Sequence, residues 1–303
     1  MALAALTIVP RSPVIIFTLI AIALAWLVVL PLWLGDEGLR HPAAGVLLMV
    51  MMTTPAIAVL IANRLVGGGR LRDTAGLRLG VPGWWRYWIF GWVVIPLFCL
   101  AAPFVAALFG LYRLDLAEFS GFREYLITAG GGIALEQFSI RTLVLFQLGS
   151  FLIAPLLNAP LAFGEELGWR GYLLPRLMRF GQIRALVISG VIWGVWHTPI
   201  ILLGYNYPNA SVQGVLQMIL FCILIGIILG WTRIATGSIW PAVIGHGALN
   251  GAAGIIGLFH RAGTHPDPTL VGITGITGLI LPALLIAGLV VSGRLPVPGR
   301  NAA

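Results

Sequence analysis

Apolar runs as long as a bilayer-spanning helix recur along the whole sequence. A helix that crosses the hydrocarbon core needs about 20 predominantly apolar residues. Eight runs reach that length, at residues 13–34, 43–63, 84–110, 142–163, 183–203, 212–232, 238–259 and 270–292. The fourth is expected to kink at Pro155 and Pro160 and to continue as a helix to about Met178. The runs predict an all-α fold, a polytopic membrane helical bundle of about eight transmembrane helices.

The composition excludes an ordinary soluble domain. Of the 303 residues, 59% are hydrophobic and 9% are charged, whereas about 25% of the residues in soluble domains are charged. A chain this apolar cannot cover itself with polar surface, so we expect an integral, multi-pass membrane protein with the lipid bilayer as a partner. The first run is longer than the apolar core of a signal peptide and no clear cleavage site follows it. We therefore expect it to be retained as the first membrane helix.

All 18 basic residues are arginines, and their distribution predicts the topology. If the N-terminus is cytoplasmic, twelve arginines fall on the cytoplasmic side of the bundle and five on the opposite side, and Arg170 lies within a predicted helix. The cytoplasmic set is Arg11, Arg64, Arg70, Arg72, Arg78, Arg86, Arg176, Arg179, Arg184, Arg233, Arg294 and Arg300, and the opposite set is Arg40, Arg113, Arg123, Arg141 and Arg261. This bias agrees with the positive-inside rule and predicts that both termini are cytoplasmic. Because the arginines lie between apolar runs, topology explains them and no nucleic-acid partner is expected.

Small residues inside the runs are explained by packing. Pairs of glycines four residues apart let helix backbones approach closely in membranes. Such pairs occur at Gly164/Gly168, Gly190/Gly194, Gly226/Gly230 and Gly247/Gly251. The two cysteines, Cys99 and Cys222, also lie inside apolar runs, and we expect them to be buried and free rather than paired in a disulfide.

Three predicted helices carry ionisable side chains deep inside their apolar runs: Glu165, His197 and His246. At a rise of about 1.5 Å per residue, Glu165 lies roughly 16 Å from the nearest arginine of the predicted cytoplasmic set. On the same rise, each histidine lies roughly 20 Å from the nearest arginine of that set along its own segment. The three groups are therefore expected at a similar depth. A charge inside the bilayer costs a few kcal/mol, so this coincidence favours a functional site over three separate structural contacts.

Three pairs of side chains at this depth are spaced four residues apart, so each pair shares one helix face. The pairs are Glu166 and Arg170, Trp193 and His197, and His246 and Asn250. The Glu166 carboxylate is expected to neutralise Arg170 and thereby to hold Glu165 in orientation. Each pair taken alone also has a structural explanation, either a buried ion pair or an interhelical hydrogen bond.

Glu165, His197, His246 and Asn250 together suit the hydrolysis of an amide bond. A carboxylate and an imidazole that face one water molecule can remove its proton. A second imidazole and an asparagine amide can stabilise the negative charge that develops on the attacked carbonyl. Glu165, His197 and His246 can also hold a divalent metal such as Zn, although the HExxH zinc signature and the GxSxG serine motif are both absent. No nucleotide cofactor is expected, because the segment VGGGR lacks the Lys-Ser/Thr of a phosphate-binding loop.

Taken together, these motifs resemble those of the CPBP family of intramembrane proteases. That family includes the CAAX prenyl endopeptidases and bacterial proteins linked to bacteriocin processing and self-immunity. The motifs are EExxxR from Glu165 to Arg170, an aromatic-xxx-His from Trp193 to His197, and HxxxN from His246 to Asn250. The resemblance covers about residues 150–255 and departs from the usual pattern at Trp193, where the family often has phenylalanine.

The resemblance implies an intramembrane endopeptidase of the glutamate or metalloprotease type that cleaves a membrane-associated peptide or protein. It implies that Glu165 and His197 activate the water and that His246 and Asn250 stabilise the oxyanion. It leaves open whether a metal takes part. The lysine-free, arginine-rich composition is typical of a GC-rich bacterial genome, so the bacterial cytoplasmic membrane is the expected location.

The predicted organisation has three parts: N-terminal membrane helices and loops at 1–140, a catalytic core at 141–260, and a C-terminal membrane helix and tail at 261–303. Two alternative functions stay open. A proton-coupled transporter also places carboxylates and histidines inside the membrane. A catalytically silent binding or immunity protein could retain the same polar residues as structural groups. The sequence leaves the oligomeric state open.

Overall fold

Each of the eight predicted runs contains helix in the computed structural model of the protein, which describes residues 12–300. Within that range, six helical segments are long and apolar enough to cross a membrane. They are α1 (Pro13–Leu34), α2 (Ala44–Leu65), α4 (Trp85–Leu108), α7 (Ile140–Glu166) with its continuation to Phe180, α11 (Ser211–Thr236), and α12 (Trp240–Ala252) with the 3-10 turn η4 (Ala253–Leu258). The predicted all-α, polytopic bundle is confirmed.

Two predicted spans are shorter than expected. The helix expected at 183–203 is divided into α9 (Gln182–Trp196) and the single turn α10 (Thr198–Ile201). Pro199 has no N–H to donate to the carbonyl four residues earlier, so the α-helical hydrogen bonding stops there. The last span starts only at the 3-10 turn η5 (Ile276–Leu279) and continues as α13 (Ile280–Val291). Residues 270–275 form turns instead, and Gly272 among them has a positive φ of 80°.

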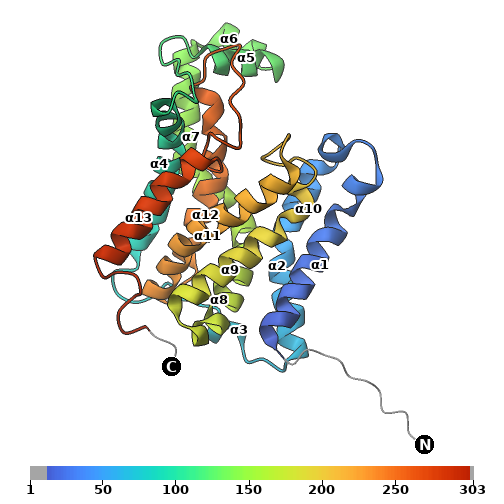
Figure 1. The fold of residues 1–303 in the computed structure, drawn as a ribbon, viewed down its shortest axis with the longest axis vertical. Coiled ribbons are helices and arrows are strands. Elements are labelled where there is room, and N and C mark those ends of the chain that lie inside the picture. The colour runs from blue at the N-terminus through green and yellow to red at the C-terminus, as the bar shows by residue number, and fades with distance from the viewer. Residues whose placement is uncertain (1–11, 301–303) are drawn as a thin grey trace, which may run out of the picture.

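The remaining elements are short and lie at the ends of the bundle. They are η1 (Gly38–Arg40), α3 (Leu71–Thr74), α5 (Ser120–Thr128), α6 (Gly132–Gln137), α8 (Leu174–Leu177) and η3 (Met178–Phe180). The helices α5 and α6 occupy the polar connection between α4 and α7, and they lie at the end of the bundle opposite α3 and α8 (Figure 1).

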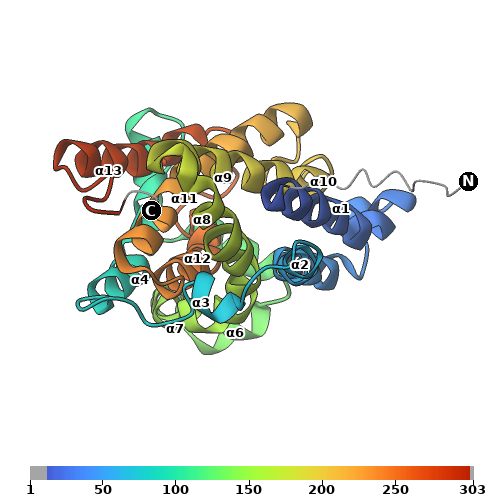
Figure 2. The same cartoon turned by 90° about the horizontal axis from the view of Figure 1, so that it is seen from below.

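Helix α12 lies at the centre of the bundle. It packs against α7, α4 and α11, while α9 packs along α11 and α1 packs along α2 (Figures 1 and 2). Most of α12 is buried, whereas less than a third of α1 is. The residues near the middle of α12 are therefore enclosed by protein rather than exposed to lipid.

Close helix contacts depend on glycine, as predicted. A Cβ atom on Gly190 of α9 would lie 2.6 Å from the Cα of Ile223 on α11, and one on Gly247 of α12 would lie 2.6 Å from the carbonyl oxygen of Pro155 on α7. Carbon atoms at such distances overlap, so only glycine fits there. Both contacts bring neighbouring helices together beside the predicted site.

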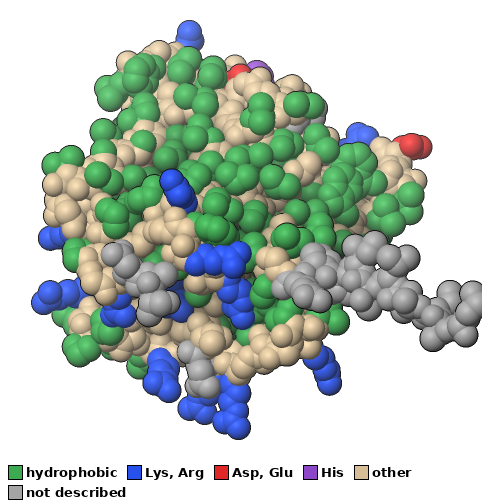
Figure 3. Space-filling model, turned by 60° about the horizontal axis from the view of Figure 1, so that its bottom comes forward, with side chains coloured by type: hydrophobic (Ala, Val, Ile, Leu, Met, Phe, Trp, Pro, Cys, Tyr) green, Lys and Arg blue, Asp and Glu red, His purple; other side chains and the backbone are tan. Residues whose placement is uncertain are grey.

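One end of the bundle carries the residues Arg64, Arg72, Arg86, Arg179 and Arg294, and we call it the arginine-rich end. Helix α1 starts there and the chain returns there after α13 (Figure 1). Figure 3 shows basic side chains gathered over this end, with the acidic side chains in view lying away from it. The positive-inside rule predicts that this end is cytoplasmic.

Candidate functional site

The two glutamates lie where α7 changes from an α-helix to a π-helix. Glu165 and Glu166 are the last residues of α7, and the π-helical turn η2 (Leu167–Leu173) follows directly. Turns of this kind are rare and frequently occur at functional sites. Here the turn carries Trp169 and Arg170, each of which bonds to the glutamate four residues before it. All of η2 is buried.

Two indole groups hold the Glu165 carboxylate. Its Oε2 atom accepts a hydrogen bond of 2.8 Å from Nε1 of Trp193 on α9 and a longer one of 3.3 Å from Nε1 of Trp169. Both indoles and the carboxylate are buried. Hydrogen bonds to an ionised group stabilise its charge and fix its geometry. Because Oε2 is occupied in this way, Oε1 is the oxygen that remains for chemistry.

Glu166 is the centre of a second network. Its Oε1 accepts from Nη1 of Arg170 at 2.7 Å and from Nδ1 of His246 at 2.8 Å. The Arg170 guanidinium also stacks over the Trp193 ring, with 4.4 Å between Cζ and the ring centroid. The predicted Glu166–Arg170 pair is thus present and fully buried. It links α7 to α12 through His246.

With both glutamates ionised, a proton on His246 would balance the charges of the buried network. Glu165 and Glu166 contribute two negative charges when ionised, and Arg170 contributes one positive charge. A buried net charge is costly unless it is paired. Nε2 of His246 faces Oε1 of Glu165 at 3.8 Å, so a proton on that nitrogen would lie between the two glutamates and complete the pairing. The imidazolium form would therefore have a carboxylate partner at each ring nitrogen.

His197 lies at the end of α9 with a fixed ring orientation. Its Nδ1 is 2.9 Å from the carbonyl oxygen of Trp193, and since a carbonyl only accepts, Nδ1 carries the proton. Nε2 is then unprotonated in the neutral ring and can act as a base. Sγ of Cys222, which is buried and free as predicted, lies 3.8 Å from Nδ1. Within the described residues, His197 forms no direct hydrogen bond with Glu165.

Asn250 lies outside this network. It follows His246 by one turn of α12, as the spacing predicted, but its side chain is exposed and forms no hydrogen bond with any residue in the range 12–300. Trp193, in contrast, has a larger part than the sequence indicated. It donates to Glu165, its carbonyl accepts from His197, and its ring contacts His246 with 5.3 Å between centroids.

Sequence reasoning missed Trp169 and the position of Gly226. Trp169 is four residues after Glu165, so the same spacing that paired Glu166 with Arg170 could have identified it. Gly226 of α11 was predicted to mark close helix packing. A Cβ atom there would lie 3.4 Å from Nη2 of Arg170. The absence of a side chain at Gly226 therefore leaves room for the buried guanidinium, and only the tertiary structure shows this.

The three predicted metal ligands do not form a metal site in this arrangement. Among the described residues, no three His, Cys, Asp or Glu side chains converge closely enough to hold a metal ion. Oε2 of Glu165 and Nδ1 of His197 and of His246 are all engaged in hydrogen bonds. The three side chains are thus not grouped around one ion in the described part of the chain, while Oε1 of Glu165 and Nε2 of both histidines stay free of hydrogen bonds.

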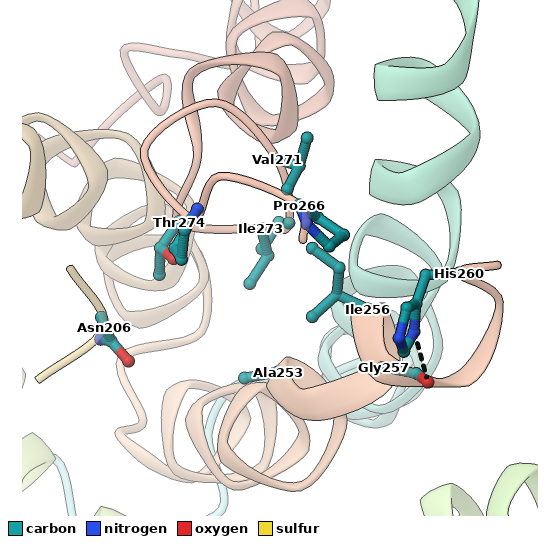
Figure 4. A pocket seen from close by; sticks show the side chains of 11 residues that line it. Asn206, Ala253, Ile256, Gly257, His260, Pro266, Val271, Ile273 and Thr274 are labelled. Carbon is teal, nitrogen blue, oxygen red and sulfur yellow. Dashed lines mark hydrogen bonds between the residues drawn. The ribbon is translucent and has the colours of Figure 1, made fainter. Parts of the chain in front are cut away.

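Two cavities of the protein lie away from the two glutamates and His246. A cavity of about 260 Å³ between η4 and the loop before α13 is lined by residues that include Asn206, His260 and Thr274, and Nδ1 of His260 bonds to the carbonyl of Gly257 (Figure 4). A second cavity of about 520 Å³ lies at the arginine-rich end. Neither is lined by Glu165 or His246.

Comparison with known proteins places the site within a matched segment. Residues 140–252 match the family described as type II CAAX prenyl endopeptidase Rce1-like. A protein of Methanococcus maripaludis named CAAX prenyl protease 2 is 33% identical over 130 residues, which cover 41% of this chain and 47% of that protein. The match thus spans about half the length of that relative. Every predicted site residue from Glu165 to Asn250 lies in the segment that matches the family.

Proposed function

We propose that the chain is an intramembrane endopeptidase that hydrolyses a peptide bond in a membrane-associated peptide or protein, because residues 140–252 match the type II CAAX prenyl endopeptidase family and a CAAX prenyl protease is 33% identical over 130 residues. The observation that best supports this proposal is the buried Glu165 carboxylate, with one oxygen held by two indoles and the other facing His246. Helix packing alone does not require a buried carboxylate held in this way near two imidazoles, so the arrangement supports a chemical role.

The proposed reaction starts with a water molecule between Glu165 and His197. Oε1 of Glu165 and Nε2 of His197 are the two basic atoms that the hydrogen bonds leave free. Either can accept the proton of a water molecule as its oxygen attacks the scissile carbonyl carbon. The proton then passes to the leaving amine, so that one water molecule is consumed and one carboxylate and one amine are formed.

His246 is the proposed donor to the oxyanion. With the Nδ1 proton directed at Glu166, Nε2 carries a proton only in the imidazolium form, which faces a carboxylate at each ring nitrogen. That N–H can stabilise the negative oxygen of the tetrahedral intermediate. Asn250 would add a second donor, since it lies one turn further along α12. Its exposed side chain would have to turn toward the bound peptide.

Glu166 and Arg170 act as positioning residues in this proposal. The ion pair between them fixes the end of α7, and the Glu166 carboxylate orients the His246 ring. Glu165, His197 and His246 are not grouped around one ion among the described residues, and the proposed water activation requires no metal. A substrate must reach these buried groups through an opening of the bundle, because the glutamates and His246 have little contact with solvent.

The test compares Glu165→Gln with wild type and with Glu118→Gln, which changes an exposed carboxylate in the same way. Peptide termini across the membrane proteome would be compared in cells that express each protein at equal levels. We expect some termini in wild type and Glu118→Gln cells that are missing with Glu165→Gln. Identical termini in all three, with each protein folded, would reject the protease and favour the silent binding or immunity protein.

A further inference from the structure

The second cavity is a groove at the arginine-rich end of the bundle, on the side where α4 and α11 meet the tail that follows α13. Its volume is about 520 Å³. Three segments that are distant in sequence form its walls. They contribute Pro82, Gly83, Arg86, Tyr87 and Phe90 from the start of α4, Trp231 and Ala235 from α11, and Gly293, Arg294, Val297 and Pro298 from the tail.

Hydrogen bonds build the tail wall of the groove. Nε1 of Trp231 donates to the carbonyl of Arg294 at 3.0 Å. The buried Gln182 side chain donates to the carbonyl of Val297 at 2.9 Å and accepts from the backbone N–H of the same residue at 2.7 Å. The tail is further anchored by Leu295, whose side chain is buried in the core. The groove is therefore a preformed part of the fold.

Two arginines at this groove lack a partner for their charge. Arg86 and Arg294 are both exposed, and neither forms an ion pair with any of the residues that the structure describes. The guanidinium of Arg86 lies only over the ring of Trp85, at 5.5 Å. Arginine groups that line a concave site match the phosphate group in both shape and charge. The two arginines at the mouth of the groove can therefore bind an anion.

The floor and surroundings of the groove are apolar and aromatic. Tyr87 and Phe90 both contact the ring of Trp231, with centroids 5.2 and 5.3 Å apart. Further along α4, Ile89 and Val93 are exposed on a helix long enough to cross the membrane. Aromatic residues at a helix end are typical of the membrane–water interface. An occupant with an anionic head and apolar chains would therefore find both kinds of contact.

We propose that this groove binds the headgroup of an anionic phospholipid from the leaflet at the arginine-rich end. The phosphodiester would lie between Arg86 and Arg294, and the acyl chains would extend along the exposed face of α4. Basic pockets between transmembrane helices are known to hold acidic lipid headgroups. A soluble phosphate would use the two arginines but not the apolar face that continues from them. This proposal is independent of the proposed protease activity.

The test is a lipid titration of the purified full-length protein in phosphatidylcholine nanodiscs. Phosphatidylglycerol is added in steps, and native mass spectrometry counts the lipid molecules that remain bound. We expect one phosphatidylglycerol to be retained by wild type, and the double variant Arg86→Ala/Arg294→Ala to bind it about tenfold more weakly. The matched control is Arg64→Ala/Arg179→Ala, which removes two exposed arginines of the same end that do not line the groove. It should stay within about twofold of wild type.

Three results would overturn the proposal. Equal weakening in both double variants would show that diffuse surface charge attracts the lipid. Equal retention of phosphatidylcholine and phosphatidylglycerol by wild type would show no preference for an anionic headgroup. Displacement of the lipid by millimolar inorganic phosphate would identify a free-phosphate site. Equal melting temperatures of all variants in phosphatidylcholine alone would ensure that weaker binding does not reflect misfolding, and Arg86→Lys/Arg294→Lys should recover part of the affinity because it retains the charge.

Discussion

Nε1 of Trp193 donates a 2.8 Å hydrogen bond to Oε2 of Glu165, and this bond joins α9 to the end of α7 in the buried centre of the protein. The same tryptophan lies under Arg170 and holds His197 through its carbonyl. A residue that the sequence placed in a supporting position thus contacts both glutamate networks and both candidate histidines.

Removing this hydrogen-bond donor should reduce activity without unfolding the protein. In Trp193→Phe the ring still packs against Arg170, but Oε2 of Glu165 loses its shorter hydrogen bond. A hydrogen bond to a charged group contributes about 2 kcal/mol, which corresponds to a loss of roughly 30-fold in kcat/KM. The control is Trp196→Phe, which removes a buried indole N–H that donates to Thr54 instead. Cleavage of a substrate peptide by purified protein measures both, and equal losses would contradict a specific role for Trp193.

Breaking the buried ion pair should destabilise the protein more than removing both charges. Glu166→Gln leaves the Arg170 guanidinium buried without its carboxylate, which costs about 3–5 kcal/mol. The double variant Glu166→Gln/Arg170→Gln removes both charges and should recover part of that loss. Thermal unfolding in detergent gives the comparison. A single variant as stable as wild type would show that the pair does not contribute to folding.

Chelation should not abolish activity, because Glu165, His197 and His246 do not converge on a shared metal. Purified protein is incubated with 1,10-phenanthroline or, as the control, with its non-chelating 1,7 isomer, and the cleavage rates are compared. We expect equal cleavage rates. Loss of cleavage with the chelating isomer alone, and its recovery on adding Zn²⁺, would instead show that the reaction requires a metal.

The contact between α9 and α11 should not tolerate even one methyl group. A Cβ atom at position 190 would overlap the Cα of Ile223, so Gly190→Ala requires the two helices to separate. Overpacking of this kind costs about 1–3 kcal/mol. Gly288→Ala on α13 is the control, because nothing lies within 4 Å of that position. The melting temperature should fall only for Gly190→Ala. Equal melting temperatures of the two variants would show that the helices can separate at little cost.

The stability of the connection before α5 should depend on pH through the carboxylate of Asp115. Hydrogen bonds from the Ser120 hydroxyl and from the backbone N–H groups of Glu118 and Ser120 hold the pKa of Asp115 well below its ordinary value. A carboxylate with a lowered folded-state pKa stabilises the fold above its unfolded value of about 4. That contribution is lost as the pH falls through the folded-state pKa.

Asp115→Asn should therefore lower the melting temperature at pH 7 and have a smaller effect at the lowest pH that the detergent micelle permits. The control is Asp267→Asn, whose carboxylate caps a different turn by accepting from Thr269. A difference between wild type and Asp115→Asn that stays constant with pH would reject the role assigned to the Asp115 carboxylate.

The apolar runs predicted the helices well because length and polarity alone determine whether a segment can span lipid. Spacing by four also predicted the contact between Glu166 and Arg170, since that relationship lies within one helix. Contacts between helices could not be predicted in the same way. The pairing of Glu166 with His246, and of Glu165 with Trp193, depends on how α7, α9 and α12 pack. The exposure of Asn250 likewise depends on neighbours that one helix does not specify.

The π-helical turn from Leu167 to Leu173 constrains how the gene can change. A π-helical turn has one residue more than the α-helical turn it replaces. Here the extra residue lies directly after the two glutamates, so it sets how the following helix is oriented relative to them. Losing a single codon within this stretch would restore an ordinary helix and rotate Arg176 and the rest of α8 by about 100° relative to Glu165. An insertion or deletion of one residue between Glu165 and Pro175 would therefore disturb the site even if every site residue were retained.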